Sequence, residues 1–147
     1  MAQAICNAEI ASRFGVPLES LDRLGIKAMS AGLTAQPGEP IAVEAEQALG
    51  KLGMPLREHR SRNLTQRLAQ RAEAIFCMTE EQRRQLIAMF PAAQPKSYRL
   101  HPDADIGDPH GKALDGVLDC ALQIQGLIRD RLNGLGVLGA GGRREWA

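Results

Sequence analysis

The sequence predicts an α/β fold of three layers, α/β/α, built on a short parallel sheet. Three apolar runs of strand length, residues 26–30, 74–78 and 96–100, alternate with segments of helical periodicity. Strands separated by helices favour parallel pairing, with helices on both faces of the sheet. The chain has 147 residues, 44% of them hydrophobic, which suits a single ordinary core. We therefore expect one domain over residues 1–132 and a Gly-rich, disordered tail over residues 133–147.

The helices are predicted from their apolar spacing and their end signals. The first has no capping residue before Met1 and ends at Gly15. Its apolar residues recur every fourth position, at Ala2, Cys6, Ile10 and Phe14. Thr79, followed by two glutamates, is typical of a helix N-cap. The expected helices cover residues 1–14, 40–52, 64–71, 79–90 and 114–128, with a linking segment at 18–24 and a polar loop at 57–63.

Charge and hydropathy argue against several classes of partner. Eighteen basic and seventeen acidic residues give a formal net charge of +1, which does not favour a general nucleic-acid or membrane-surface binder. No run approaches the roughly 20 apolar residues of a membrane helix, and the start of the chain does not look like a signal peptide. We expect a cytoplasmic protein.

The cysteines and histidines are scattered. Neither set has the spacing of a disulfide framework or of a metal site. We therefore expect free thiols in a reducing compartment, and neither a metal nor another cofactor. The residues concerned are Cys6, Cys77, Cys120, His59, His101 and His110.

Residues 101–111, His-Pro-Asp-Ala-Asp-Ile-Gly-Asp-Pro-His-Gly, bring three carboxylates together ahead of the last helix. Pro109 restricts the residue before it to extended backbone, so Asp108 should stand out from the loop. An aspartate with an ordinary pKa of about 3.9 donates a proton at neutral pH only if burial or a nearby anion, such as phosphate, raises that pKa. Asp108 is the candidate acid. The alternative is that Asp-Pro and His-Gly form only a turn.

Three segments with polar groups each follow a predicted strand. They are Ser30 with the two residues after it, the step from Met78 to Thr79, and residues 101–111, here called the aspartate loop. Parallel α/β sheets bind ligands at the carboxyl ends of their strands. We expect these three segments to meet at one edge of the sheet.

Six short motifs follow one another along residues 1–132. They are Met1-Ala-Gln-Ala-Ile5, Ser30-Ala-Gly32, Gly53-Met-Pro55, His59-Arg-Ser-Arg-Asn-Leu-Thr65, Ala72-Glu-Ala-Ile-Phe-Cys-Met-Thr79 and Asp105-Ile-Gly-Asp-Pro109. In order and spacing they resemble the low-molecular-weight protein-tyrosine phosphatases, in particular the bacterial branch that includes the protein-arginine phosphatases. The resemblance implies a four-stranded parallel sheet and a phosphorylated protein as substrate.

The family's phosphate-binding loop is the main departure. In the family a first strand runs into a C-x-x-x-x-x-R-[ST]-P loop, whose cysteine attacks phosphorus and whose arginine holds the phosphate oxygens. Both the strand and the loop are absent here, and the loop would end just before Met1. We expect the chain to be truncated at its N-terminus, either by start-site assignment or by excision from a longer chain.

Cys77 and Arg83 formally satisfy C-x-x-x-x-x-R, but we reject them as a substitute loop. A phosphate cradle needs glycines that let backbone N–H groups turn inward. The segment has no glycine, and Glu80 and Glu81 would repel phosphate and raise the thiol pKa. Cys6 lies in a helix, and Cys120 is expected to pack.

The resemblance implies a role for each remaining site residue. Asp108 would protonate the leaving group and then act as base toward water, supported by Pro109. Ser30 would hydrogen-bond the phosphate loop, or else only cap backbone at its strand end. Asp105 would brace the aspartate loop. His59 would join a polar network, or be an exposed loop residue.

The expected function is therefore that of a phosphoprotein phosphatase acting on tyrosine or arginine phosphate, with the 147-residue chain itself inactive. His110-Gly111 after the Asp-Pro pair is closer to the arginine-phosphatase type. One alternative is a pseudophosphatase that serves as an interaction domain. An arsenate reductase is less favoured, because no second cysteine follows Cys77 within forty residues. The sequence gives no prediction of oligomeric state.

Overall fold

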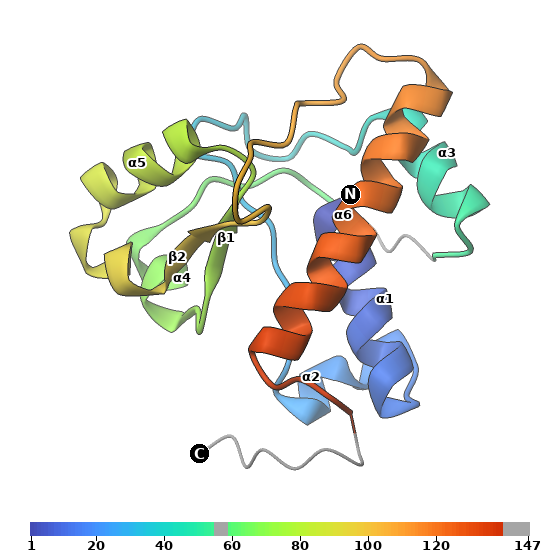
Figure 1. Cartoon of the computed structure of the whole chain (residues 1–147), viewed down its shortest axis with the longest axis horizontal. Helices are drawn as coiled ribbons and strands as arrows, with labels where there is room; N and C mark the ends of the chain where they lie inside the picture. The colour runs from blue at the N-terminus through green and yellow to red at the C-terminus, as the bar shows by residue number, and fades with distance from the viewer. Residues whose placement is uncertain (55–58, 140–147) are drawn as a thin grey trace. The chain divides into compact units, whose positions relative to one another are not determined.

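The computed structural model describes residues 1–54 and 59–139 (Figure 1). Pro55, residues 57–58 of the expected polar loop and residues 140–147 of the expected tail lie outside this range. No helix within the described residues is long and apolar enough to cross a membrane.

The chain divides into two compact units. The first, here called the helical unit, contains Met1–Ser30, Ile41–His59 and His110–Ala147. The second, the sheet unit, contains Ala31–Pro40 and Arg60–Pro109. The expectation of one domain over residues 1–132 stays a prediction.

In the helical unit, α6 (Leu114–Gly134) packs against both α1 (Ala2–Phe14) and α3 (Val43–Lys51) (Figure 1). The short helices η1 (Leu18–Ser20) and α2 (Leu21–Leu24) follow α1. The buried face of α6 has the predicted helical spacing, and each of its buried Val, Ile and Leu side chains contributes about 1.5–3 kcal/mol. The buried residues of α6 are Val117, Ala121, Ile124, Ile128 and Leu132.

Helix α1 ends where the sequence predicts. Gly15 takes a left-handed conformation with φ of 63°, and Val16 N–H donates to the carbonyl oxygen of Ala11 at 3.0 Å. The buried side chains of α1 are Ile5, Ile10 and Ala11, so only Ile10 of the predicted stripe is fully buried. The reason is geometric: a strict four-residue repeat drifts about 40° per step around a helix of 3.6 residues per turn.

The expected strand at 26–30 is not a strand in the structure. Its backbone is satisfied by side chains of α1 instead of by a neighbouring strand. Asn7 Oδ1 accepts from Ala28 N–H at 2.7 Å, Asn7 Nδ2 donates to Ala28 O at 3.1 Å, and Gln3 Oε1 accepts from Ser30 N–H at 2.8 Å. This asparagine therefore satisfies the same two backbone groups that a sheet neighbour would satisfy.

Residues 133–139 also differ from the expected disordered tail. Helix α6 continues through Gly134, and Val137 is buried. Arg13 Nη1 donates to Asn133 Oδ1 at 2.8 Å and to Val137 O at 2.7 Å. The Arg13 side chain of α1 thus hydrogen-bonds both the last turn of α6 and the segment that follows it.

The sheet unit contains a two-stranded parallel sheet, so the predicted α/β class with a short parallel sheet is confirmed. Strand β1 (Ile75–Cys77) pairs with β2 (Ser97–Arg99), and Phe76 stands opposite Tyr98. Between them run α5 (Glu80–Met89) and η2 (Pro91–Lys96), and α4 (Gln66–Arg71) precedes β1 (Figure 1). The buried side chains include Ala69, Leu86, Ala93, Leu100 and Ile106.

The predicted start of α5 is confirmed, whereas the predicted start of α3 is not. Thr79 caps α5, as predicted: its side chain accepts from Gln82 N–H, and the Gln82 side chain accepts in return from the backbone of Thr79. The helix expected from Pro40 begins only at Val43, because Pro40 forms an antiparallel bridge with Arg60.

Candidate active site

The aspartate loop leaves and rejoins the sheet at the carboxyl end of β1. Leu100 N–H donates to the carbonyl oxygen of Cys77 at 2.8 Å, and Ile106 N–H donates to that of Met78 at 2.9 Å. Both Leu100 and Ile106 are buried. The five residues from 101 to 105 therefore form an excursion between Leu100 and Ile106, which are tied to adjacent residues at the end of one strand.

Asp105 connects this loop to the start of α5. Its Oδ1 accepts from the backbone N–H of Glu80 at 2.9 Å and from Arg99 Nη1 at 3.2 Å. The Glu80 N–H and then the Arg99 guanidinium lower the pKa of Asp105, because both favour the ionised carboxylate. Asp105 itself is exposed. Its carboxylate also suits the positive end of the α5 helix dipole.

Asp108 lies two residues beyond the buried anchor Ile106. It is exposed and outside any helix or strand, and the next helix, α6, begins only at Leu114. Pro109, which follows it, is partly buried. The tether at Ile106 thus places Asp108 near the carboxyl end of the sheet with its side chain open to solvent.

Ser30 belongs to the helical unit. Its hydroxyl donates to Gln3 Oε1 at 3.1 Å, and the same oxygen accepts from the Ser30 backbone N–H. Ser30 is therefore tied to the first turn of α1.

Neither Cys6 nor Cys77 has the low thiol pKa of a nucleophile. Burial, and then the negative charge of Glu9, raise the pKa of Cys6 to about 11, with Arg13 opposing them. Burial also raises the pKa of Cys77, against an opposing effect of Arg83. Both thiols are protonated at neutral pH, whereas attack on phosphorus requires a thiolate.

The segment from Cys77 to Arg83 does not form a phosphate cradle. Gln82 Oε1 accepts from the backbone N–H groups of Met78 and Thr79, at 3.0 and 3.3 Å, and Asp105 accepts from that of Glu80. Arg83 Nε donates to Ser97 O at 3.0 Å, and its Nη1 pairs with Glu80 at 3.2 Å. An anion would have to displace these partners.

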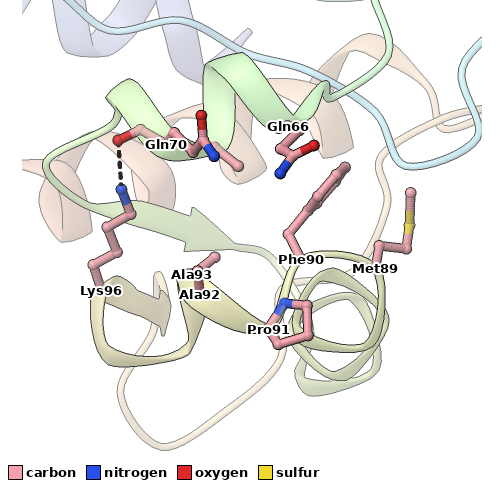
Figure 2. A pocket seen from close by; sticks show the side chains of 9 residues that line it. Gln66, Gln70, Met89, Phe90, Pro91, Ala92, Ala93 and Lys96 are labelled. Atoms are coloured by element: carbon pink, nitrogen blue, oxygen red, sulfur yellow. Dashed lines mark hydrogen bonds between the residues drawn. The ribbon is translucent and has the colours of Figure 1, made fainter.

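A separate pocket of about 350 Å³ lies between α4, the end of α5 and η2 (Figure 2). Phe90 and Gln66 face each other across it, and Lys96 Nζ reaches the carbonyl oxygen of Gln70 at 3.0 Å (Figure 2). It shares no residue with the aspartate loop. No three His, Cys, Asp or Glu side chains of the described chain are grouped so that they could hold a metal ion.

Sequence reasoning missed two residues that organise this region. Gln82 could have been found, because Thr79-Glu-Glu-Gln82 is the S/T-x-x-E/Q pattern of a capping box. No sequence pattern marks Arg99, because its contacts with Pro102 and Asp105 depend on the path that the aspartate loop takes after β2.

Comparison with known proteins identifies a family and several relatives of this chain. A family model described as low molecular weight phosphotyrosine protein phosphatase matches residues 2–134. The "Probable low molecular weight protein-tyrosine-phosphatase EpsP" of Ralstonia solanacearum is 32% identical over 103 residues, which cover 69% of this chain and 71% of that protein. The protein-arginine-phosphatase of Geobacillus stearothermophilus is 29% identical over 120 residues, which cover 78% of this chain and 80% of that one.

Solved structures show the same fold. The YwlE arginine phosphatase from Geobacillus stearothermophilus matches with a TM-score of 0.77 at 24% identity, covering 91% of this chain and 82% of that one. The low molecular weight protein tyrosine phosphatase from T. tengcongensis matches with a TM-score of 0.76 at 26% identity. The match covers 90% of this chain and 88% of that one. The chain therefore belongs to the low molecular weight phosphotyrosine protein phosphatase family.

Proposed function

We propose that the complete protein is a cytoplasmic phosphoprotein phosphatase that works through a cysteinyl-phosphate intermediate, with Asp108 as its general acid and base. Family membership supports phosphatase chemistry. The observation that carries the role of Asp108 is the tether of Ile106 to Met78, which holds the Asp-Pro pair near the carboxyl end of the parallel sheet.

The proposed chemistry has two steps. A cysteine thiolate attacks phosphorus, the bond from phosphorus to the leaving oxygen or nitrogen breaks, and Asp108 gives its proton to the leaving atom. Asp108, now ionised, takes a proton from water as that water attacks the phosphocysteine. Phosphate leaves, the thiolate is regenerated and Asp108 is protonated again.

We assign the nucleophile to a C-x-x-x-x-x-R-[ST]-P loop outside residues 1–147. The raised thiol pKa values of Cys6 and Cys77 make these two residues poor nucleophiles. Accordingly, the 147-residue chain alone should hydrolyse no phosphate ester. Asp105 and Pro109 support the acid, and Ser30 would hydrogen-bond the added loop.

The substrate is a protein carrying phosphotyrosine or phosphoarginine. Of the two relatives described above, the Ralstonia solanacearum protein is named a tyrosine phosphatase and the Geobacillus stearothermophilus protein an arginine phosphatase. His110-Gly111 after the Asp-Pro pair resembles the arginine-directed type more closely, because many tyrosine-directed members carry aromatic residues there. Parallel assays with a phosphotyrosine peptide and a phosphoarginine peptide would distinguish the two.

The test compares the 147-residue chain with an extended chain in which a strand and a C-x-x-x-x-x-R-[ST]-P loop precede Met1. Only the extended chain should hydrolyse para-nitrophenyl phosphate. In it, Asp108→Asn should lower kcat by about 10²-fold or more, whereas the matched change Asp103→Asn, in the same exposed loop, should have little effect. Turnover by the 147-residue chain that is abolished by Asp108→Asn would refute the assignment of the nucleophile.

A non-catalytic interaction domain is the second candidate, favoured by the protonated state of the Cys6 and Cys77 thiols. Its signature is a stably folded chain that does not bind phosphate. A thermal-shift titration with phosphate or vanadate separates the two, because a ligand stabilises only a protein that binds it. If phosphate or vanadate stabilises the extended chain but not the 147-residue chain, the phosphatase is supported. If it stabilises neither chain, the interaction domain is supported.

A further inference from the structure

We propose that Arg99 is a positioning residue for the general acid: through Asp105 and Pro102 it sets the path of the loop that carries Asp108. This inference rests on the proposed role of Asp108. It assigns no contact between Arg99 and substrate.

One guanidinium group spans the loop. Arg99 Nη1 donates to Asp105 Oδ1 at 3.2 Å, and Nη2 donates to the carbonyl oxygen of Pro102 at 3.1 Å. The two acceptors lie on either side of residues 103–104, so the planar fork of Arg99 sets the distance across this turn. Lysine cannot reproduce that geometry, because its ammonium group is a single point donor.

Asp105 carries the effect to a second element. The oxygen that accepts from Arg99 also accepts from Glu80 N–H at the start of α5, at 2.9 Å. Strand β2, the loop and α5 therefore share one carboxylate oxygen. The pKa of Asp105 is lowered by these two donors, so the carboxylate is charged at neutral pH and all three elements stay joined.

The loop leads directly from this junction to the acid. Ile106 follows Asp105, is buried, and donates its N–H to Met78 O. Asp108 is two residues further on. Without Arg99, the turn at 102–105 would lose the group that spans it. The hydrogen bond from Ile106 to Met78 would then form less often, and the position of Asp108 would be less well defined.

The role of Arg99 differs from that of an ordinary surface charge. The side chain of Arg99 is 25% exposed and that of Asp105 is 52% exposed, so their ion pair contributes little to global stability. Removing it should leave the fold intact and disturb the loop locally. Arg84, exposed on α5 in the same unit, is a matched control for the loss of one arginine charge.

The first experiment measures amide hydrogen exchange by NMR in the 147-residue chain. In Arg99→Gln, the amides of Glu80 and Ile106 should exchange about 10-fold faster, because both belong to the connection that Arg99 completes. Arg84→Gln should leave them unchanged, and Arg99→Lys should fall between. Unchanged protection of both amides in Arg99→Gln would overturn the inference, whether or not the protein is an enzyme. If Arg99→Gln does not fold, the exchange rates of the Glu80 and Ile106 amides are measured in Arg99→Lys instead, and unchanged rates would again overturn the inference.

The second experiment compares two leaving groups in the extended chain. A general acid matters more for phenyl phosphate, which releases a basic phenolate, than for para-nitrophenyl phosphate. Arg99→Gln should lower kcat/KM, which reports the step that releases the leaving group, about 10-fold for phenyl phosphate and much less for para-nitrophenyl phosphate. Displacement of a catalytic group by about 1 Å costs up to roughly 10²-fold. Asp108→Asn should show the same asymmetry, only larger.

The two variants separate the two hypotheses. If Asp108→Asn lowers kcat/KM equally for both esters, the proposed function is wrong. If Asp108→Asn shows the asymmetry and Arg99→Gln does not, the role of Arg99 is wrong while that of Asp108 stands. An equal loss with both esters in Arg99→Gln would mark a general structural defect and would also overturn the positioning role.

Discussion

The backbone N–H of Ile106 donates to the carbonyl oxygen of Met78 at 2.9 Å, and this bond returns the aspartate loop to the end of β1. The side chain of Ile106 is only 3% exposed. Burial of one isoleucine thus tethers a loop whose other members are mostly exposed. The position of Asp108, two residues later, depends on that tether.

Truncation of this anchor should cost stability as well as activity. Ile106→Ala removes buried methyl groups and leaves a cavity, so the free energy of unfolding should fall by about 2–5 kcal/mol in urea titrations. Met89→Ala, at a side chain that is 49% exposed in the same unit, should change it by only about 0.5 kcal/mol. Equal losses in the two variants would show that Ile106 is not an anchor.

Asp105 should make the stability of the chain depend on acid pH. Its pKa is lowered in the folded protein by Glu80 N–H and then by Arg99, so folding favours the ionised form. The stabilisation is fully present above the unfolded pKa of about 3.9 and is lost as the pH falls through the lower folded value.

The urea midpoints of the wild type and of Asp105→Asn should therefore differ most near neutral pH and converge in strong acid. A direct measurement is the carboxyl carbon titration of Asp105 by NMR, whose midpoint should lie below the unfolded value. A midpoint at or above that value would contradict the hydrogen bonds assigned to this carboxylate.

The thiol of Cys6 should resist alkylation at neutral pH. Burial, then Glu9, raise its pKa to about 11, so only a minute fraction is thiolate at pH 7. Iodoacetamide labelling followed by peptide mass spectrometry should show slow modification of Cys6 that accelerates toward pH 11. In urea the same residue should react with the pH dependence of a free cysteine, whose pKa is about 8.5. Rapid labelling of the folded chain at pH 7 would make Cys6 a candidate nucleophile after all.

Two glycine substitutions test whether the chain after α6 is packed. Gly139 has φ of 98°, and a Cβ added there would lie 2.2 Å from the carbonyl oxygen of Arg13, so Gly139→Ala should destabilise the protein. Gly126 lies within α6 with open space around its Cα, so Gly126→Ala should stabilise it by about 0.5–1 kcal/mol. Thermal unfolding of both variants measures this contrast. A neutral Gly139→Ala would indicate that residues 135–139 do not pack against α1.

The sequence by itself determined the features that depend on near neighbours. The cap of α5 at Thr79, the buried spacing of α6, the stop of α1 at Gly15 and both strands of the sheet were all predicted. The position of Asp108 outside a helix was also predicted, because Pro109 restricts the residue before it. Such signals involve residues within about one helical turn or one strand of each other.

Tertiary structure decided the features that join distant residues. Asn7 takes the place of a strand neighbour for Ala28, Arg13 fastens Val137, and Arg99 spans a loop whose path becomes visible only in the fold. In each case a polar side chain satisfies a backbone group far from it in sequence or brought near it by a turn. Such a pairing depends on where packing brings the two groups, and neither periodicity nor composition encodes that.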